Sequence, residues 1–230
     1  MISKRLELEI LSKIELEITH LCNKYCELCD HRIKFSPYKY LTKEEYRYLS
    51  SHIEERDRIN EIHLIGGEPF LHPFLPWLLE NIRKDFPTTN ITVVTNGSLL
   101  PMIKDEILDM FRAIAISTYS SWNDEIISSL KGRSNIFIRG GTLFENPYQD
   151  PNLSEENAKE IRKKCLFQVR VVGTNLYGCC LSEGIERYYH TDKAHVKFKK
   201  SWRDDFFNIP TWRACQHCFS KIDVQEKQKE

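Results

Sequence analysis

Short runs of apolar and β-branched residues alternate with amphipathic stretches through the first 140 residues of the chain. The runs predict strands at residues 14–19, 61–65, 91–95, 113–118 and 135–138, and the stretches between them predict helices at 41–56, 73–85, 102–111 and 124–130. Strands that alternate with helices pair in parallel in one sheet. The pattern therefore predicts an α/β fold, specifically a partial (β/α) barrel.

This alternation ends after Gly141, and a turn-rich segment with two prolines follows at residues 146–154. A Lys- and Glu-rich helix is expected at 155–164, followed by strands at 167–172 and 175–177 around a turn at Gly173. We therefore expect a barrel domain in residues 1–150 and a small C-terminal appendage in residues 151–230.

Composition and charge exclude several classes of partner. Lys plus Arg and Asp plus Glu both total 33, so the formal charge is zero and nothing favours nucleic acid or an anionic membrane. No segment has the roughly 20 apolar residues of a membrane span, and the N-terminus lacks a signal-peptide core. A cytoplasmic protein is expected. The eight cysteines then favour metal ligation over disulfides.

Three of these cysteines, Cys22, Cys26 and Cys29, directly follow the first predicted strand. They would lie on a loop at the C-terminal mouth of the barrel, where the active sites of barrel enzymes are found. Three thiolates bind three irons of a four-iron cluster, which leaves one iron open to another ligand. A zinc site or unrelated buried thiols are the alternatives.

The Cys22-x3-Cys26-x2-Cys29 spacing, with Gly66-Gly67-Glu68-Pro69 at the end of the second predicted strand, resembles the radical S-adenosylmethionine (SAM) superfamily. The resemblance implies a 4Fe-4S cluster whose open iron binds SAM. It also implies SAM contacts from the glycine-rich segment and at the ends of later strands. The residues that it places near SAM are Gly66, Gly67, Glu68, Pro69, Thr95, Asn96, Ser117 and, beside adenine, Leu28. Ordinary strand-end turns are the alternative for Thr95, Asn96 and Ser117.

The other five cysteines lie in the last third of the chain. They resemble the auxiliary-cluster ligands of the twitch domain found in some radical SAM enzymes. On that resemblance the ligands of an auxiliary 4Fe-4S cluster are Cys165, Cys179, Cys215 and Cys218, with Cys180 as the alternative to Cys179. A four-cysteine zinc ribbon uses the same residue types. A fully ligated cluster serves electron transfer most directly.

Arg139-Gly140-Gly141 at the end of the fifth predicted strand resembles 2-deoxy-scyllo-inosamine dehydrogenases. This resemblance implies a 5'-deoxyadenosyl radical that takes hydrogen from a small polar substrate. It further implies two-electron oxidation of an alcohol carbon, with the auxiliary cluster as electron acceptor and flavodoxin or ferredoxin as reductant. Arg139 would lie near the substrate, although a salt bridge to the surface or to the SAM carboxylate fits this residue equally well.

Three other functions stay open. A peptide-modifying radical SAM maturase often carries a leader-peptide domain, and the residues before the first strand are expected to be too few for one. A redox-neutral sugar epimerase or dehydratase would need a hydrogen donor, for which Cys180 is a candidate. A non-enzymatic zinc module does not explain the glycine-rich motif. Four histidines near the predicted mouth could transfer protons, but the sequence singles out none of them: His20, His31, His63 and His72.

Overall fold

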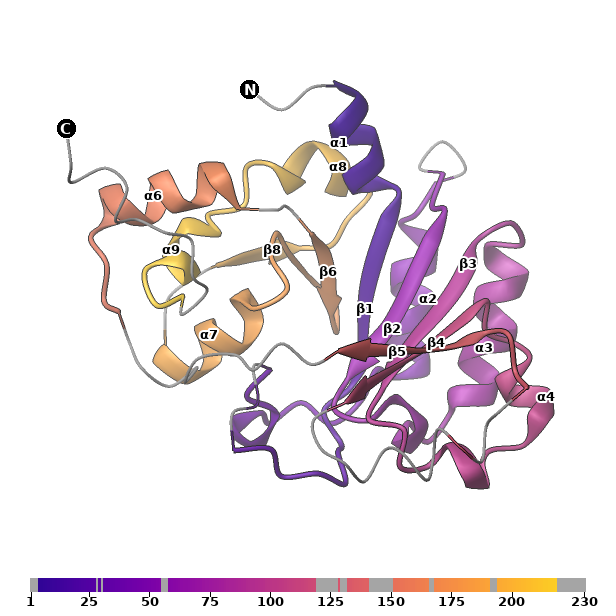
Figure 1. The fold of residues 1–230 in the computed structure, drawn as a ribbon. Helices are drawn as coiled ribbons and strands as arrows, with labels where there is room; N and C mark the ends of the chain where they lie inside the picture. The colour runs from indigo at the N-terminus through magenta and orange to yellow at the C-terminus, as the bar shows by residue number, and fades with distance from the viewer. Residues whose placement is uncertain are drawn as a thin grey trace.

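The computed structural model describes residues 4–27, 29, 31–54, 58–118, 128, 132–140, 151–165, 168–190 and 194–218. Its centre is a single sheet of eight strands in the order β5-β4-β3-β2-β1-β6-β7-β8 (Figure 1). The strands are β1 (Lys13–Thr19), β2 (Glu61–Gly66), β3 (Asn90–Thr95), β4 (Ala113–Thr118), β5 (Ile136–Gly140), β6 (Val169–Val172), β7 (Asn175–Tyr177) and β8 (His195–Lys197).

The first five strands pair in parallel, each with the next in sequence. The helices between them are α2 (Lys43–Ser51), α3 (Leu75–Asp85) and α4 (Asp105–Leu108), with short 3-10 turns η1 (Ile33–Phe35), η3 (Pro69–Leu71) and η4 (Leu100–Met102). The predicted βα order is confirmed, and the sheet is open rather than closed into a barrel. The predicted helix at 124–130 lies outside the described residues, apart from residue 128.

The N-terminus of α2 carries a capping box. The Thr42 hydroxyl accepts a hydrogen bond from the Glu45 amide at 3.1 Å, and the Glu45 carboxylate accepts one from the Thr42 amide at 2.9 Å. Two amides that the helix itself leaves unpaired are thereby satisfied. The expected helix start at this threonine is confirmed, but the helix ends at Ser51, five residues before the predicted end.

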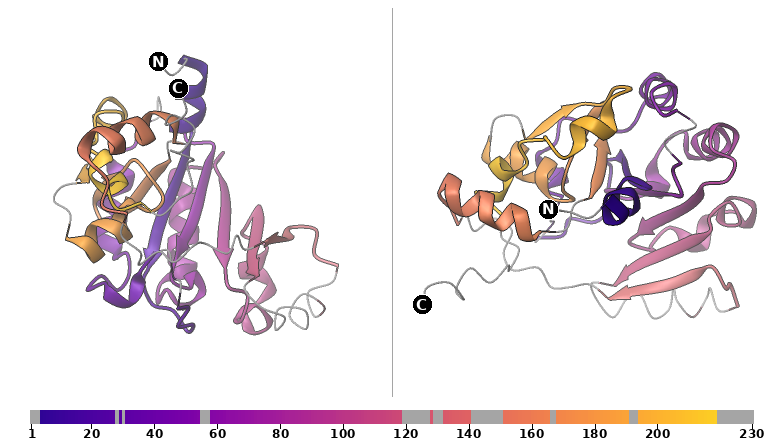
Figure 2. Two further views of the ribbon diagram at one scale, coloured as in Figure 1. Left: turned by 60° about the vertical axis from the view of Figure 1, so that its left-hand side comes forward. Right: turned by 90° about the horizontal axis from the view of Figure 1, so that it is seen from above.

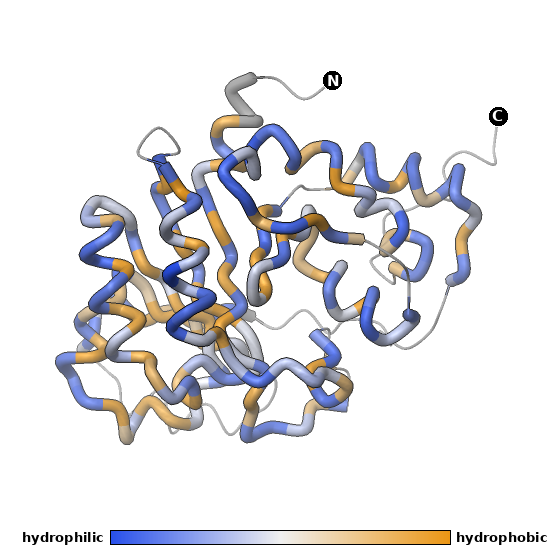
Figure 3. The backbone as a smooth tube through the Cα atoms, turned by 180° about the vertical axis from the view of Figure 1, so that it is seen from behind, coloured by the Kyte–Doolittle hydropathy of each residue, from blue (hydrophilic) through white to orange (hydrophobic). Residues whose placement is uncertain are grey.

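Helices α2, α3 and α4 lie along one face of the sheet, as the two turned views show (Figure 2). Their apolar and polar residues alternate along the tube in Figure 3, as expected for helices with one buried side. Alternate residues of β1 face these helices, including Ile14 and Leu16, which are at most 5% exposed. The core therefore lies between the sheet and this helical layer.

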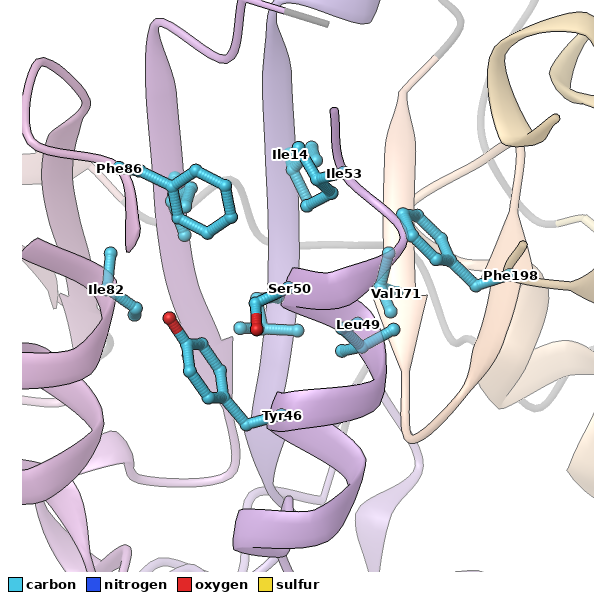
Figure 4. A pocket seen from close by; sticks show the side chains of 11 residues that line it. Ile14, Tyr46, Leu49, Ser50, Ile53, Ile82, Phe86, Val171 and Phe198 are labelled. Carbon is cyan, nitrogen blue, oxygen red and sulfur yellow. The ribbon is translucent and has the colours of Figure 1, made fainter. Parts of the chain in front are cut away.

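A small cavity of about 20 Å³ remains in this core, beneath α2 (Figure 4). Its walls are almost wholly apolar and include Ile14, Leu49, Val171 and Phe198. A space of that size could hold one water molecule, but water needs polar partners that these walls do not supply. The cavity is therefore a packing defect of the core and is unrelated to the cysteines.

The C-terminal part of the chain extends the same sheet instead of forming a separate one. β6 pairs in parallel with β1, and β7 and β8 follow in antiparallel order. The predicted strands around Gly173 are confirmed as β6 and β7. Gly173 lies in the turn between them and has φ +56°. The remaining helices are α1 (Lys4–Leu11), α6 (Glu155–Lys164), α7 (Ser182–Tyr189), α8 (Trp202–Phe206) and α9 (Trp212–Cys215).

Within the described residues, no helix is both long enough and apolar enough to cross a bilayer.

Candidate functional site

The loop that carries the first three cysteines leaves the carboxyl end of β1. The same edge of the sheet receives the ends of β2, β3 and β4, because these strands are parallel and in register, with Thr19 opposite Gly66 and Thr95 opposite Ile116. The sequence motifs at the strand ends therefore meet at one edge. This is the edge where ligands bind in open α/β sheets.

Gly66 and Gly67 allow the backbone of the cysteine loop to cross β2 closely. A Cβ atom on Gly66, which has φ +142°, would lie 2.0 Å from the Thr19 carbonyl oxygen. A Cβ on Gly67 would lie 2.4 Å from the Leu21 carbonyl oxygen and 3.0 Å from Cβ of Cys22. The Gly67 amide donates to Thr19 at 2.6 Å. Both glycines are thus required by contacts within the protein.

Glu68 is fully buried and connects the end of β2 to the end of β3. Its carboxylate accepts hydrogen bonds from the Thr95 hydroxyl at 2.7 Å, the Asn96 amide at 2.9 Å and the Phe70 amide at 3.2 Å. Burial raises the pKa of this carboxyl group above its ordinary value, although the three donors oppose the shift. The geometry gives Glu68 a structural role, and its expected contact with SAM stays a prediction.

Asn96 connects the end of β3 to the cysteine loop. Its side-chain NH2 donates to Asn23 Oδ1 at 3.0 Å and lies 4.0 Å from the sulfur of Cys22. Its side-chain oxygen accepts from the amide and hydroxyl of Ser98, and the Asn23 NH2 donates to the Ser98 hydroxyl at 2.8 Å. Asn96 therefore orders the loop near its first cysteine.

All three cysteines of this loop are free thiols, and Cys26 is exposed while Cys22 and Cys29 are half-buried. The sulfur of Cys22 accepts a hydrogen bond from the Lys24 amide at 3.4 Å. Burial raises the pKa of the Cys22 thiol, and the carboxylate of Glu68 adds to the shift. A bound cation would reverse that balance, so this donor set suits a metal-thiolate centre.

The remaining predicted residues of this edge differ in how exposed they are. Pro69 is buried at the start of η3, and Ser117 is buried at the end of β4. Arg139 lies opposite Ser117 on β5 and is exposed. Leu28 lies outside the described residues.

The second group of cysteines lies where α6, α7, α9 and the end of β7 meet. Cys165 ends α6, Cys215 ends α9, and both α6 and α7 contact α9. Cys179, Cys180 and Cys218 pack against one small apolar cluster that includes Leu181 and Ala214. All five thiols are free. The four predicted ligands and the alternative Cys180 thus come from one region of the fold.

Cys179 and Cys180 differ in their surroundings. The Cys179 sulfur accepts a hydrogen bond from the Leu181 amide at 3.4 Å. A hydrogen bond from Cys180 is the main cause that lowers the pKa of Cys179 to about 6, and the charges of Arg162 and Arg170 add to it. The pKa of Cys180 is raised by the same hydrogen bond and by burial. The hydrogen bond from the Leu181 amide is a geometric difference that favours Cys179 as the ligand.

Sequence reasoning missed a buried ionic network on the sheet face opposite α2. Glu15 and Glu17 alternate with the core residues of β1, and Arg170 on β6 donates to Glu15 at 2.7 Å and to Glu17 at 3.1 Å. Glu17 also contacts His20 at 2.7 Å and His31 at 3.4 Å, and Arg170 and His20 are at most 7% exposed. The alternation of residues 13–19 was the available signal, because strands of parallel sheets are normally apolar on both faces.

Glu17, His20 and Glu183 place three ligand atoms within 4.8 Å of one another, the spacing of a metal site. However, Arg170 donates to Glu17, and Arg187 donates to Glu183. A divalent cation would have to displace or repel these guanidinium groups. The three residues therefore form part of the ionic network rather than a metal centre.

Comparison with known proteins places the first cysteine loop and the glycine-rich segment in one family model. Residues 16–121 match the model of the radical SAM superfamily. A putative L-lysine 2,3-aminomutase of Aquifex aeolicus is 24% identical over an alignment of 221 positions, which covers 87% of this chain and 58% of that protein. A GTP 3',8-cyclase of Sulfurovum sp. is 28% identical over 98 residues, which are 42% and 30% of the two chains. The chain spans less than two thirds of each of these relatives.

Among solved structures, BtrN in complex with AdoMet and 2-DOIA has a TM-score of 0.60 and 16% sequence identity. The superposition covers 91% of this chain and 93% of BtrN. An open conformation of BtrN has a TM-score of 0.55, with 90% and 86% of the two chains covered. At these identities the likeness concerns the fold alone.

Proposed function

We propose that this chain, in which residues 16–121 match the radical SAM superfamily model, is a radical SAM oxidoreductase that acts on a small polar substrate. The observation that carries the proposal is the loop after β1. It presents three free thiols at the carboxyl edge of the sheet, and Gly67 and Asn96 fix its backbone and its first cysteine. Three thiols on one loop fit a four-iron cluster with one open iron.

When bound, the cluster and SAM supply a 5'-deoxyadenosyl radical that abstracts hydrogen from the substrate. The chain itself would hold the cluster through Cys22, Cys26 and Cys29. The residues proposed to surround SAM are Gly66 to Pro69, Thr95, Asn96, Ser117 and Leu28. Thr95 and Asn96 are already hydrogen-bonded to Glu68, so the wall of that site is pre-organised.

Oxidation of an alcohol carbon to a ketone removes one hydrogen atom, one proton and one further electron from the substrate. We propose that the electron passes to an auxiliary 4Fe-4S cluster held by Cys165, Cys179, Cys215 and Cys218 in a twitch-like region, residues 151–230. A four-cysteine zinc ribbon would use the same residue types, so metal content separates the two centres.

The substrate would be a sugar or aminocyclitol. The support for this class is the fold shared with BtrN, whose structure is of a complex with AdoMet and 2-DOIA. Arg139, exposed on β5, is proposed to orient a substrate hydroxyl. Flavodoxin or ferredoxin is the proposed reductant, and a cytoplasmic location is part of the proposal.

A redox-neutral rearrangement is the second candidate. It is favoured by the aminomutase and the cyclase among the relatives, since neither name implies net oxidation of an alcohol. The two candidates differ in their products, because only oxidation yields a ketone.

The test uses anaerobically reconstituted protein with SAM, dithionite and 2-deoxy-scyllo-inosamine that carries deuterium at the carbinol carbon. The proposal predicts methionine, 5'-deoxyadenosine that contains deuterium, and the corresponding ketone. Deuterated 5'-deoxyadenosine with an isomeric product would favour the rearrangement. Absence of 5'-deoxyadenosine from a fully iron-loaded preparation would contradict radical SAM activity, and a Cys26→Ala variant provides the blank.

A further inference from the structure

Helix α7, in the C-terminal part of the chain, contacts the segments at both ends of the first cysteine loop. This helix begins at Ser182, three residues after Cys179, and its far end contacts η1, which follows the loop. Figure 1 shows α7 beside the segment that leaves β1. One short helix therefore lies between the two groups of cysteines.

Arg187 of α7 contacts both ends of the loop. Its guanidinium group lies 3.2 Å from Nδ1 of His20, before the first cysteine, and donates at 3.0 Å to the carbonyl oxygen of His31, after the third. The carboxyl group of Glu183, one turn earlier, accepts a hydrogen bond from the same guanidinium group. The side chain of Arg187 is 12% exposed, so these contacts are largely shielded from water.

His20 has further partners at the buried end of β1. Its Nδ1 also lies 2.5 Å from the hydroxyl of Ser36, and its Nε2 lies 2.7 Å from the Glu17 carboxylate. Arg187 thereby connects α7 through His20 to the buried end of β1.

Two aromatic residues at the end of α7 also contact the segment that follows the loop. The guanidinium carbon of Arg32 lies 5.2 Å from the ring centres of both Tyr188 and Tyr189, and Arg32 is fully buried. Tyr188 also packs edge-to-face on Phe35, with ring centres 5.0 Å apart. Arg32 has φ +50°, a conformation that a residue other than glycine keeps only when its surroundings enforce it.

From this geometry we infer that Arg187 is a positioning residue for the SAM-binding site, and that α7 couples the second cysteine site to it. This inference rests on the proposed function, since it assumes a cluster at each site. Binding of a cluster by Cys179 and Cys215 fixes the start of α7. The helix in turn holds His20 and His31, and hence the loop between them, in the arrangement that accepts SAM.

The test measures SAM affinity by the change in the electron paramagnetic resonance signal of the reduced first cluster. An Arg187→Met variant keeps an unbranched, mainly apolar stem and removes the guanidinium donors. The matched control is Arg203→Met. Arg203 is another half-buried arginine of the C-terminal part, but it donates to the carbonyl oxygen of Leu11, which lies before the start of β1 and away from the cysteine loop. We expect unchanged iron content in both variants, and SAM affinity at least tenfold weaker in Arg187→Met alone.

A double-mutant cycle tests the coupling. Cys215→Ala with Cys218→Ala should also weaken SAM binding, and adding Arg187→Met to that background should cost much less than tenfold, because the helix is already released. Equal SAM affinity in Arg187→Met and Arg203→Met would overturn the positioning role, and strict additivity would overturn the coupling. Absence of iron from the unmodified protein would instead count against the proposed function.

Discussion

The Glu68 carboxylate accepts a hydrogen bond from the Thr95 hydroxyl at 2.7 Å, with both side chains buried. Through this contact the glycine-rich motif after β2 and the polar motif after β3 form one unit. The same carboxylate accepts from the Asn96 amide, and the Asn96 side chain reaches the cysteine loop. Three sequence motifs are therefore one hydrogen-bonded structure.

Replacement of Glu68 by Gln tests this unit. One oxygen becomes an NH2 group, which removes the acceptor either of the Asn96 amide or of both the Thr95 hydroxyl and the Phe70 amide in a buried site. We expect a loss of about 1–3 kcal/mol in the free energy of unfolding, measured by urea denaturation. The exposed Glu106→Gln variant should change it by less than about 0.5 kcal/mol. Equal stability of both variants would mean that the Glu68 contacts contribute nothing.

Gly67→Ala should disturb the cysteine loop directly. The added Cβ would lie 2.4 Å from the Leu21 carbonyl oxygen, so the loop must move away from β2. We expect reconstituted protein to bind far less iron at the first site. Gly132→Ala is the control, because Gly132 has φ +106° but nothing within 4 Å of the added Cβ. This control introduces backbone strain without moving the loop, so normal iron content in both variants would contradict the close contact as the reason for Gly67.

Glu183 should make stability depend on pH. Burial, together with the negative charge of Glu17, raises the pKa of Glu183 to about 8 in the folded protein. A carboxyl pKa that is raised on folding stabilises the protein most below the unfolded-state value near 4.5, and this contribution falls as the pH rises toward 8. Glu183→Gln mimics the protonated form.

The free energy of unfolding of the Glu183→Gln variant and of the unmodified protein is therefore measured by urea denaturation at pH 5.5 and at pH 8.5. Glu183→Gln should gain stability relative to the unmodified protein as the pH rises between these values. If the ion pair with Arg187 kept Glu183 ionised throughout, the variant would be less stable by the same amount at both pH values.

The cavity beneath α2 offers a stabilising substitution far from the cysteines. Val171 lines this cavity and is 2% exposed, so Val171→Ile should fill part of the space with one additional methylene group. We expect a gain of up to about 0.8 kcal/mol, seen as a rise of roughly 2–3 °C in Tm. Val196→Ile, on β8 and outside the cavity, should have no such effect. A lower Tm for Val171→Ile would show that the cavity cannot accept the group.

The alternation of apolar runs and helices predicted the parallel strands well, because each strand of this part of the sheet is a short, mostly apolar segment between turns. The cysteine loop and the glycine-rich motif were visible because their chemistry depends on residue type and spacing. By contrast, Arg170 and Glu17 lie 153 residues apart in the chain. Only the parallel pairing of β6 with β1 brings them together, and a local pattern does not specify that pairing.

The hydrogen bonds of Glu68 could not be predicted from the sequence. The family resemblance placed Glu68 near SAM, which stays a prediction, and only the fold shows that its carboxylate accepts three hydrogen bonds from the protein. Likewise, the contacts of Arg187 with His20 and His31 depend on the direction in which α7 leaves the second group of cysteines. Such relationships are fixed by tertiary packing rather than by local preference.

The most direct test of the whole account is the iron, sulfide and zinc content of anaerobically reconstituted protein, compared with a variant in which Cys22, Cys26 and Cys29 are all Ala. The account predicts about eight irons, falling to about four in the variant, and no zinc. About four irons with one zinc would contradict the second cluster as electron acceptor, and absence of iron would contradict the radical SAM assignment itself.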